Sequence, residues 1–474
     1  MRFDPGVTDI TQAELQYILD EIGVSAGSAA STLAIKGTPQ DLNSPLRVID
    51  AGAIALAAQA IALAALAQKR AAAPESHAPE DISIDARQIV FSFKPFFYTL
   101  LDGAPTGSWT GLAAAAPCMG HFKCADGRFV YMCSLVPKLR NATLRFLDCE
   151  ATREAVAKAV ANWNSEALEA AMTAQGIPVA VVRDGDEWLK SEQGLALRSS
   201  PLIPIKQLAK SAPVALTKAD RPFASIKVVD MTHVLAGPML TRGLAEYGAE
   251  VLHLSSGNPE HDDPKPVSFE FRLGKKTATL DLNDAAGRET LAELLRDADV
   301  FVHSWRPGVF ERYGFTPEQI AALNPSIIQL AVSCYGPVGS WSARGGFDGL
   351  ALASTGATAL EALYGPPKVS PPGVVTDALV GVLGTAVVAS LLQRRAEQGG
   401  SYRADLSLAR ISMWLIGLGL ESVSPDHSEE LGEPRLRQLE TPVGMVDHVA
   451  SPIGFSGIES QLPFAGALDR PIWG

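Results

Sequence analysis

The stretch Lys227–Ser255 constrains the fold of this chain more than any other, because it reads as one complete strand–helix–strand unit. Val228–Met231 is rich in β-branched residues and predicts a strand. Leu235–Pro238 predicts a tight turn with proline at the start of a helix, and Gly248 ends that helix before a second strand at Glu250–Leu254. Many α/β proteins contain such a unit. Its turn nevertheless predicts an anion site, because free backbone N–H groups point outward at a helix N-terminus.

Strands and helices continue to alternate after this unit. The predicted strands are Thr277–Leu282, Asp299–Val302 and Ile327–Val332, and the predicted helices are Ala285–Leu295 and Pro317–Leu323. This alternation predicts an α/β fold with a doubly wound, parallel, Rossmann-like sheet. Because ligands bind such sheets where the strands end, we expect the loops that begin near Met231, Ser304 and Ser333 to be neighbours.

The first half of the chain predicts a smaller α+β domain. Its predicted elements are helices at Gln12–Gly23, Ala51–Ala73, Thr152–Ala174 and Glu187–Leu197, a strand-to-helix segment at Ile82–Phe93, a hairpin at Met119–Leu135 and a strand at Val179–Val182. The hairpin turns at Asp126-Gly127, which is a strong turn signal. Pro201–Pro222 is dotted with prolines and predicts a linker. We therefore expect domains at 1–220, with the small α+β region at about 105–200, and at 221–474.

Composition and charge narrow the classes of partner. The chain has 474 residues, and its net charge of −12 argues against nucleic acid, because phosphate binding needs a basic face. Its five cysteines suit a reducing compartment and show no metal-binding spacing, and the charged N-terminal residues predict no signal peptide. The apolar run Ala51–Ala67 contains Gln59 and predicts a buried helix rather than a membrane span. We expect a cytoplasmic protein with no metal, membrane or nucleic-acid partner.

A sequence echo links the two halves. The helix tail AALAQKRA at Ala64–Ala71 resembles ASLLQRRA at Ala389–Ala396. Each tail is followed by a predicted strand that contains an aspartate, Asp85 in one case and Asp405 in the other. Alanine-rich helices match each other easily by chance, but the shared order of helix, loop and strand favours descent from two related halves.

Asp377 lies at the start of a strongly apolar helix and has two interpretations. Aspartate at a helix start is most often a cap. The alternative is a carboxylate beside a glycine-lined surface, with Gly381 and Gly384 facing inward, that attacks an acyl carbon and forms a covalent intermediate. Amides at the helix N-terminus would then keep the carboxylate ionised.

Several cations and one tyrosine stand at predicted strand or loop ends. Arg306 is either a solvated charge or a phosphate ligand that makes two parallel hydrogen bonds. Lys275 and Lys276 are either an exposed basic pair or a phosphate clamp. Tyr335 lies in a turn after a strand, and His233 beside the anion site is interpreted as structural or ligand-contacting.

Motifs of other enzyme classes are absent from the sequence. It contains no GxGxxG after the first strand, no GxxxxGK[ST], no HExxH and no GxSxG between a strand and a helix. The usual support for a nicotinamide enzyme, a P-loop enzyme, a zinc hydrolase or an α/β-hydrolase is therefore missing.

Several segments, in order, resemble the family III coenzyme A transferases, the CaiB–BaiF group that includes formyl-CoA transferase and α-methylacyl-CoA racemase. They are VVDMTHVLAGPMLTRGLAEYGAEVLHL, RLGKKTATLDLND, DADVFVHSWRPGVFERYGFTPEQIAALNPSIIQLAVSCYGPVG, GGFDGLALASTG and GVVTDALVGVLGTAVVASLLQRR. The resemblance spans about residues 225–410. In the first half, CADGRFVYMCS and EALEAAMTAQGIPVAVVRDGDEWLKSEQGLAL resemble the smaller domain of the same family.

The resemblance implies the chemistry and the ligands. Asp377 matches the family aspartate that forms an acyl–enzyme anhydride and then an aspartyl–CoA thioester. The implied CoA contacts are Val234, Leu235, Ala236, Lys275, Lys276 and Arg306, and Tyr335 matches a tyrosine near the acyl site. Coenzyme A or acyl-CoA would be a substrate rather than a permanently bound cofactor, and a carboxylic acid would be the second partner.

The order of the segments is unusual for the family. The first half lacks the leading nucleotide-binding segment, and the second half lacks the small domain before SPIGFSGIE, which resembles the family's closing strand. We hypothesise that two degenerate halves complement each other in an interlocked pseudo-dimer, the alternative being a homodimer, and that the first half is catalytically silent.

Three functional hypotheses follow from the resemblance. The first is a CoA-transferase that moves CoA between an acyl-CoA and a carboxylic acid. The second is a 2-methylacyl-CoA racemase, which is weaker because Phe347 stands where racemising members have a histidine. The third is a CoA-binding protein without catalytic activity.

Overall fold

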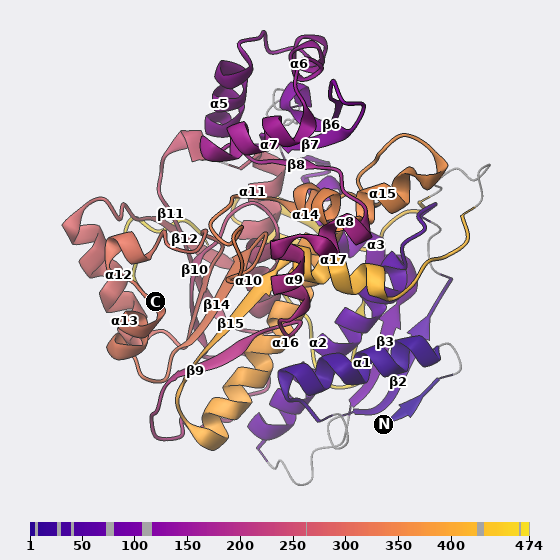
Figure 1. The fold of residues 1–474 in the computed structure, drawn as a ribbon. Coiled ribbons are helices and arrows are strands. Elements are labelled where there is room, and N and C mark those ends of the chain that lie inside the picture. The colour runs from indigo at the N-terminus through magenta and orange to yellow at the C-terminus, as the bar shows by residue number, and fades with distance from the viewer. Residues whose placement is uncertain are drawn as a thin grey trace.

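A seven-stranded sheet forms the centre of the second half of the molecule (Figure 1). The computed structural model describes residues 1–4, 8–25, 30–38, 42–72, 80–106, 116–261, 263–423, 431–463 and 466–473. The strand order is β12 (Lys275–Thr279), β11 (Glu250–Ser255), β10 (Lys227–Met231), β13 (Val300–His303), β14 (Ile328–Ser333), β15 (Ser401–Ser407) and β9 (Ile205–Ala209). The first six strands are parallel. The predicted doubly wound sheet is confirmed.

Helices cover both faces of this sheet because alternate strand residues point to opposite sides. On β10, Val228 packs in the core that contains α10 (Ala236–Glu246) and α16 (Val375–Gln398). Its neighbour Val229 packs in the other core, with α12 (Ala285–Asp297) and α13 (Pro317–Leu323).

The expected linker Pro201–Pro222 is not wholly a linker. It contains β9, which pairs with β15 in the antiparallel direction and closes that edge of the sheet. The proline-dotted sequence does not suggest a strand, but β9 forms because its backbone can pair with the free N–H and C=O groups at the edge of β15.

A four-stranded sheet in the first half repeats this pattern. Its order is β1 (Arg2–Phe3), β2 (Ala30–Lys36), β3 (Glu80–Asp85) and β18 (Ile453–Gly454). The first three strands are parallel, and β18 is antiparallel to β3. The series β13, β14, β15 and β9 has the same sequence of directions. Each parallel series therefore ends in an antiparallel strand that comes from the other half of the chain.

The two echo helices pack side by side in the core. They are α2 (Val48–Arg70) and α16, and the strands β3 and β15 follow them in the chain. Both are long and apolar enough to cross a membrane, but 89% and 94% of their most apolar windows are buried in the protein. The prediction of a buried helix at Ala51–Ala67 is confirmed.

The small region that projects at the top of Figure 1 is the predicted α+β unit of the first half. Its sheet is β6 (Met119–Lys123), β7 (Phe129–Cys133) and β8 (Val179–Val181), with α5 (Pro137–Leu147), α6 (Arg153–Val160) and α7 (Ser165–Ala174) around it. The hairpin is confirmed. The single helix expected at Thr152–Ala174 is wrong, because Asn164 caps α7 by accepting hydrogen bonds from the backbone N–H groups of Glu166 and Ala167.

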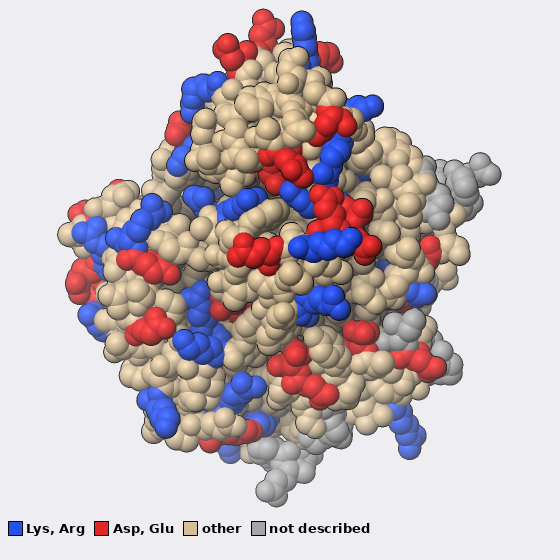
Figure 2. Space-filling view, viewed as in Figure 1, with Lys and Arg blue, Asp and Glu red and all other residues tan. Residues whose placement is uncertain are grey.

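A fourth sheet also joins the halves. It contains β16 (Leu436–Thr441), β17 (Gly444–Val449), β4 (Leu100–Leu101) and β5 (Ala104–Pro105). Three of the four sheets in the described part of the chain therefore combine strands from before and after residue 220. On the face seen in Figure 2, acidic and basic side chains are interspersed rather than gathered by sign.

Candidate active site

Asp377 lies in the first turn of α16 and is 6% exposed. It does not act as the helix cap. Asp348, the first residue of α14 (Asp348–Thr355), takes that role: its Oδ1 accepts hydrogen bonds from the Thr376 backbone N–H and hydroxyl, both at 2.6 Å, and from the Asp377 N–H at 3.4 Å. Among the described residues, no side chain or backbone group donates a hydrogen bond to the Asp377 carboxylate. The helix thus holds the Asp377 carboxylate in place, and its oxygens remain available to a ligand.

The electrostatics of the two carboxyl groups correct one expectation. Burial raises the pKa of Asp348 to about 6, although the hydrogen bonds from Thr376 oppose this rise. Burial, and then the charge of Asp348, raise the pKa of Asp377 well above its usual range. The expectation that helix amides keep Asp377 ionised is therefore wrong, because Asp348 receives those amides. The site contains two close carboxyl groups that resist being charged together.

Side chains from both halves of the chain surround these carboxyl groups. On β7, Val130 and Met132 point into the core of the small region, whereas Tyr131 and Cys133 point the other way, into the main core with α14 and α16. Burial raises the pKa of Cys133 to about 12, and the nearby Asp377 carboxylate adds to the rise. The first half therefore contributes directly to the surroundings of Asp377.

The turn Val234–Ala236 lies between β10 and α10. Val234 has φ of +67°, which is strained for a β-branched residue. Its N–H donates to Asp263 Oδ2 at 2.9 Å, which holds the turn in this conformation. Val234 and Leu235 belong to an apolar cluster that reaches towards Asp377. Its other members are Phe96, Val267 and Phe271, with Leu135, Met239, Phe347 and Val374 packed against them.

The two lysines do not face this turn as an exposed basic pair. Lys275 is fully buried, and its Nζ donates to Asp230 Oδ2 at 3.0 Å, Pro238 O at 3.0 Å and Thr241 Oγ1 at 2.6 Å. The Lys275 ammonium is thus occupied inside the fold, which does not suit a phosphate clamp. It instead fixes the first turn of α10. Lys276 pairs with Glu250 at 2.7 Å, at the start of β11.

Arg306 and Tyr335 meet at a cavity of about 280 Å³. The cavity lies between the α7–β8 turn, represented by Ile177, and the loops after β13 and β14. Arg306 is exposed and makes no ion pair with a described residue. The Tyr335 hydroxyl is within 3.2 Å of Ser354 Oγ. Ser304, after β13, accepts a hydrogen bond from the His233 N–H at 3.0 Å, so the strand-end loops do meet as predicted.

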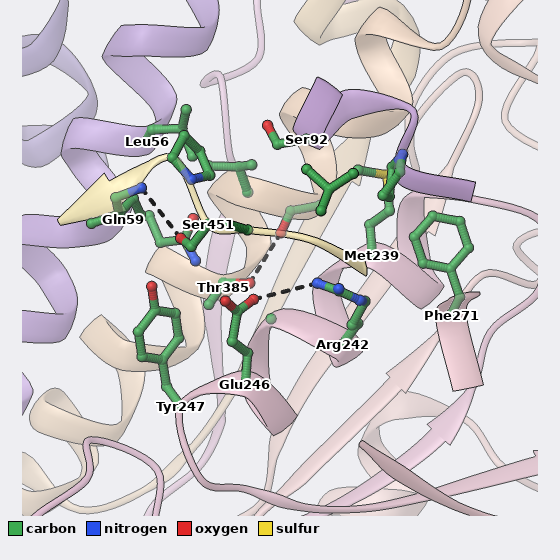
Figure 3. Close-up of a pocket in the computed structure, with 18 residues that line it drawn as sticks. Leu56, Gln59, Ser92, Met239, Arg242, Glu246, Tyr247, Phe271, Thr385 and Ser451 are labelled. Carbon is green, nitrogen blue, oxygen red and sulfur yellow. Dashed lines mark hydrogen bonds and ion pairs between the residues drawn. The ribbon is translucent and has the colours of Figure 1, made fainter. Parts of the chain in front are cut away.

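A second cavity, of about 80 Å³, lies where α2, α10 and α16 converge (Figure 3). Arg242 points across it towards Glu246, with 3.4 Å between the charged groups. Arg242 also lies 2.9 Å from the carboxylate of Glu270. None of the residues predicted for CoA or for catalysis lines this cavity. Of its two ion pairs, one lies within α10 and the other joins α10 to α11 (Lys265–Arg272).

Metal ligands are not clustered in the described part of the chain. No group of three or more His, Cys, Asp or Glu side chains among the described residues could hold an ion.

The family model for CoA-transferase family III matches residues 223–434, which contain the six parallel strands of the sheet, the turn, Asp348 and Asp377. Residues 223–434 are thus similar to CoA-transferase family III. The acetyl-coenzyme A transferase nodX of Hypoxylon pulicicidum is 37% identical over 213 residues, covering 43% of this chain and 35% of the relative. An acyl-CoA transferase of Gibberella moniliformis is 30% identical over 277 residues, covering 56% and 48%. The chain thus spans less than half the length of these curated relatives.

A crystal structure of a CaiB/BaiF family protein from Brucella suis is also similar. It is 24% identical, with 41% of this chain and 55% of that chain covered and a TM-score of 0.39.

The sequence analysis missed three features of the site. It did not assign the capping role of Asp348, the contact of Asp263 with the turn, or the position of Tyr131 and Cys133 beside Asp377. The alternation of Val130–Cys133 was the available signal for the last of these, because it places two polar side chains on one face of a strand whose other face is apolar.

Proposed function

We propose that this protein moves CoA between an acyl-CoA and a carboxylic acid, with Asp377 as the nucleophile. The main support is the state of the Asp377 carboxylate. It is buried, accepts no hydrogen bond from the described residues, and lies in the first turn of a helix beside an apolar cluster. A carboxylate of this kind is a competent nucleophile once it loses its proton. The relatives named acyl-CoA and acetyl-CoA transferases support the same reaction class.

The proposed reaction has four transfers. One Asp377 oxygen attacks the thioester carbonyl, the C–S bond breaks, and an acyl anhydride forms as CoA thiolate leaves. The thiolate attacks the Asp377 carbonyl and releases the first acid as a carboxylate, which leaves an aspartyl–CoA thioester. The second carboxylate attacks the carbonyl carbon of this thioester, so that a new anhydride forms and CoA thiolate leaves. The thiolate then attacks the acyl carbonyl of that anhydride, which gives the new acyl-CoA and frees the Asp377 carboxylate.

The proposed CoA site follows the strand ends. Val234, Leu235 and Ala236 would present the backbone of the turn to the carrier, and Lys275 would act indirectly by holding the first turn of α10. Arg306 would bind a phosphate from its exposed position. Tyr335 would line the way from the Arg306 cavity towards the acyl group. Lys276 would contribute only if it left Glu250.

The test is to trap the covalent intermediate. The protein is incubated with a panel of acyl-CoAs, treated with borohydride or hydroxylamine, and digested for mass spectrometry. We expect the modification on the peptide that contains Asp377, and we expect none in Asp377→Ala, which should still bind CoA. A wild-type protein that binds CoA but forms no adduct and transfers no CoA across a panel of carboxylic acids would favour a CoA-binding role and sink the proposal.

A further inference from the structure

Tyr131 is, with Cys133, one of two first-half side chains that lie near the paired carboxyl groups. It stands on β7, and its ring packs against His121, with 4.9 Å between ring centroids. Tyr131 is 8% exposed, and its hydroxyl makes no hydrogen bond with any described residue. A buried tyrosine normally finds a hydrogen-bond partner, so an unpaired Tyr131 hydroxyl that still contacts solvent can donate to a ligand.

Gly349 fixes where this hydroxyl lies. A Cβ atom built on Gly349 would lie 2.4 Å from two Tyr131 ring atoms and 2.7 Å from the hydroxyl oxygen. The edge of the ring therefore rests directly on the backbone of Gly349, and only glycine leaves room for it. Because Gly349 immediately follows Asp348, the hydroxyl is held beside the carboxyl pair by packing rather than by a hydrogen bond.

The hydroxyl is a donor at neutral pH. Burial raises the pKa of Tyr131 well above its usual range, and Cys133, Asp348 and Asp377 raise it further. Other donors near the site already have acceptors. The Thr376 and Asp377 amides donate to Asp348, and the Tyr335 hydroxyl is within hydrogen-bonding distance of Ser354.

We propose that the Tyr131 hydroxyl, supplied by the first half of the chain, donates the hydrogen bond that stabilises the oxyanion during attack by Asp377. This inference rests on the proposed CoA transfer. When an Asp377 oxygen bonds to the thioester carbon, the carbonyl electron pair moves onto its oxygen, and the Tyr131 O–H donates to that oxygen without losing its proton. The pair returns when the C–S bond breaks and CoA thiolate leaves. Tyr131 thus supplies a fixed dipole.

Tyr131→Phe tests this role because it removes one oxygen and keeps the ring on Gly349. Loss of one oxyanion donor lowers kcat by about 10²-fold in enzymes that use one. We expect a fall of that order in kcat, with the KM for acyl-CoA changed by less than about twofold, because the bond is made in the transition state. The matched control is Tyr402→Phe. It removes another buried hydroxyl, which donates to Gly399 O at 2.9 Å near the start of β15, and it should leave kcat unchanged.

A double-mutant cycle separates this role from general packing. Gly349→Ala should displace the Tyr131 ring and lower kcat to about the level of Tyr131→Phe. Combined with Tyr131→Ala, which opens the space for the new methyl group, Gly349→Ala should cost little more. Additive losses in this cycle would overturn the assigned placement.

The outcomes distinguish this inference from the proposed function. If the wild-type protein transfers CoA and forms the Asp377 adduct, but Tyr131→Phe retains wild-type kcat, the role of Tyr131 is wrong and the proposed function stands. If the wild-type protein forms no adduct and transfers nothing, both fail together.

Discussion

The two long core helices, α2 and α16, are similar in length, burial and position in their halves, but only α16 has the proposed nucleophile in its first turn. When Arg70 of α2 is aligned with Arg395 of α16, Gly52 falls at the position of Asp377. A Cβ on Gly52 would lie 2.5 Å from Ile89 and 2.9 Å from Phe93, so the fold leaves no space for a side chain there. Asp50, the nearest carboxylate on α2, pairs with Arg47 at 2.8 Å.

The difference lies in what covers the first turn of each helix. The start of α2 is covered by apolar side chains of α3 (Ile89–Phe93), which follows it in the same half. The start of α16 is covered by Asp348 and by β7 of the other half. The surroundings of the two helix starts therefore differ: apolar side chains fill the space at Gly52, whereas polar groups lie beside Asp377.

The strongest test of this comparison exchanges matched carboxyl groups. Asp377→Asn should lower CoA transfer by at least about 10³-fold, because the amide is a far weaker nucleophile than the carboxylate. Asp50→Asn on α2 should retain nearly full activity. Steady-state rates of acyl-CoA formation measure both variants, and comparable losses in the two would mean that the halves are not functionally different.

The ends of the two helices give a test of stability. The Arg70 guanidinium donates to three carbonyl oxygens, those of Thr217, Pro222 and Ala224, at 2.7–3.0 Å. Arg70→Met would leave these buried acceptors without donors and should lower the free energy of unfolding by about 3 kcal/mol.

Lys69→Met is the matched control for Arg70→Met. Lys69 forms an exposed ion pair with Glu397 across the two helices. Its loss should cost less than about 1 kcal/mol. Urea unfolding of both variants compares their free energies of unfolding. Equal losses would contradict the larger stabilising role expected for Arg70.

The smallest expected effect is a shift in pH dependence. Asp377 must lose its proton to attack, and its pKa is raised by burial and by Asp348. Activity should therefore fall as the pH drops through that raised value. Asp348→Asn removes the neighbouring charge while its side-chain oxygen can still accept from Thr376. The acid limb of kcat/KM should move to lower pH, by about one unit or less.

The control for the pH profile is Glu361→Gln. Glu361 is also buried with a raised pKa, and it binds Ser44 and Lys368 rather than any group at the site. This variant should leave the acid limb in place. An acid limb that stays fixed in Asp348→Asn would contradict the coupling of the two carboxyl groups.

Sequence patterns predicted the parts of the fold that depend on local signals. The unit at Lys227–Ser255, the parallel strands after it and the hairpin at Met119–Leu135 follow from periodicity and turn residues, and the structure has them. Family resemblance singled out Asp377, whose role stays a proposal. These predictions needed only residues close together in the sequence.

Features that depend on distant partners could not be predicted. The strand β9 forms because β15, almost 200 residues later, offers a free edge. Lys275 is buried because Asp230 and Thr241 satisfy its ammonium. The raised pKa of Asp377 results from the competition of Asp348 for the helix amides. None of these partners is marked by spacing or composition.

The exchange of β9 and β18 also bears on how the chain is made. During synthesis, β3 is complete after residue 85, but its antiparallel neighbour β18 lies at Ile453–Gly454. The edge of β3 therefore keeps unpaired backbone N–H and C=O groups until almost all of the described chain has been synthesised. Until β18 arrives, that edge can pair with strands of other chains, so association between unfinished chains is a hazard of this strand order.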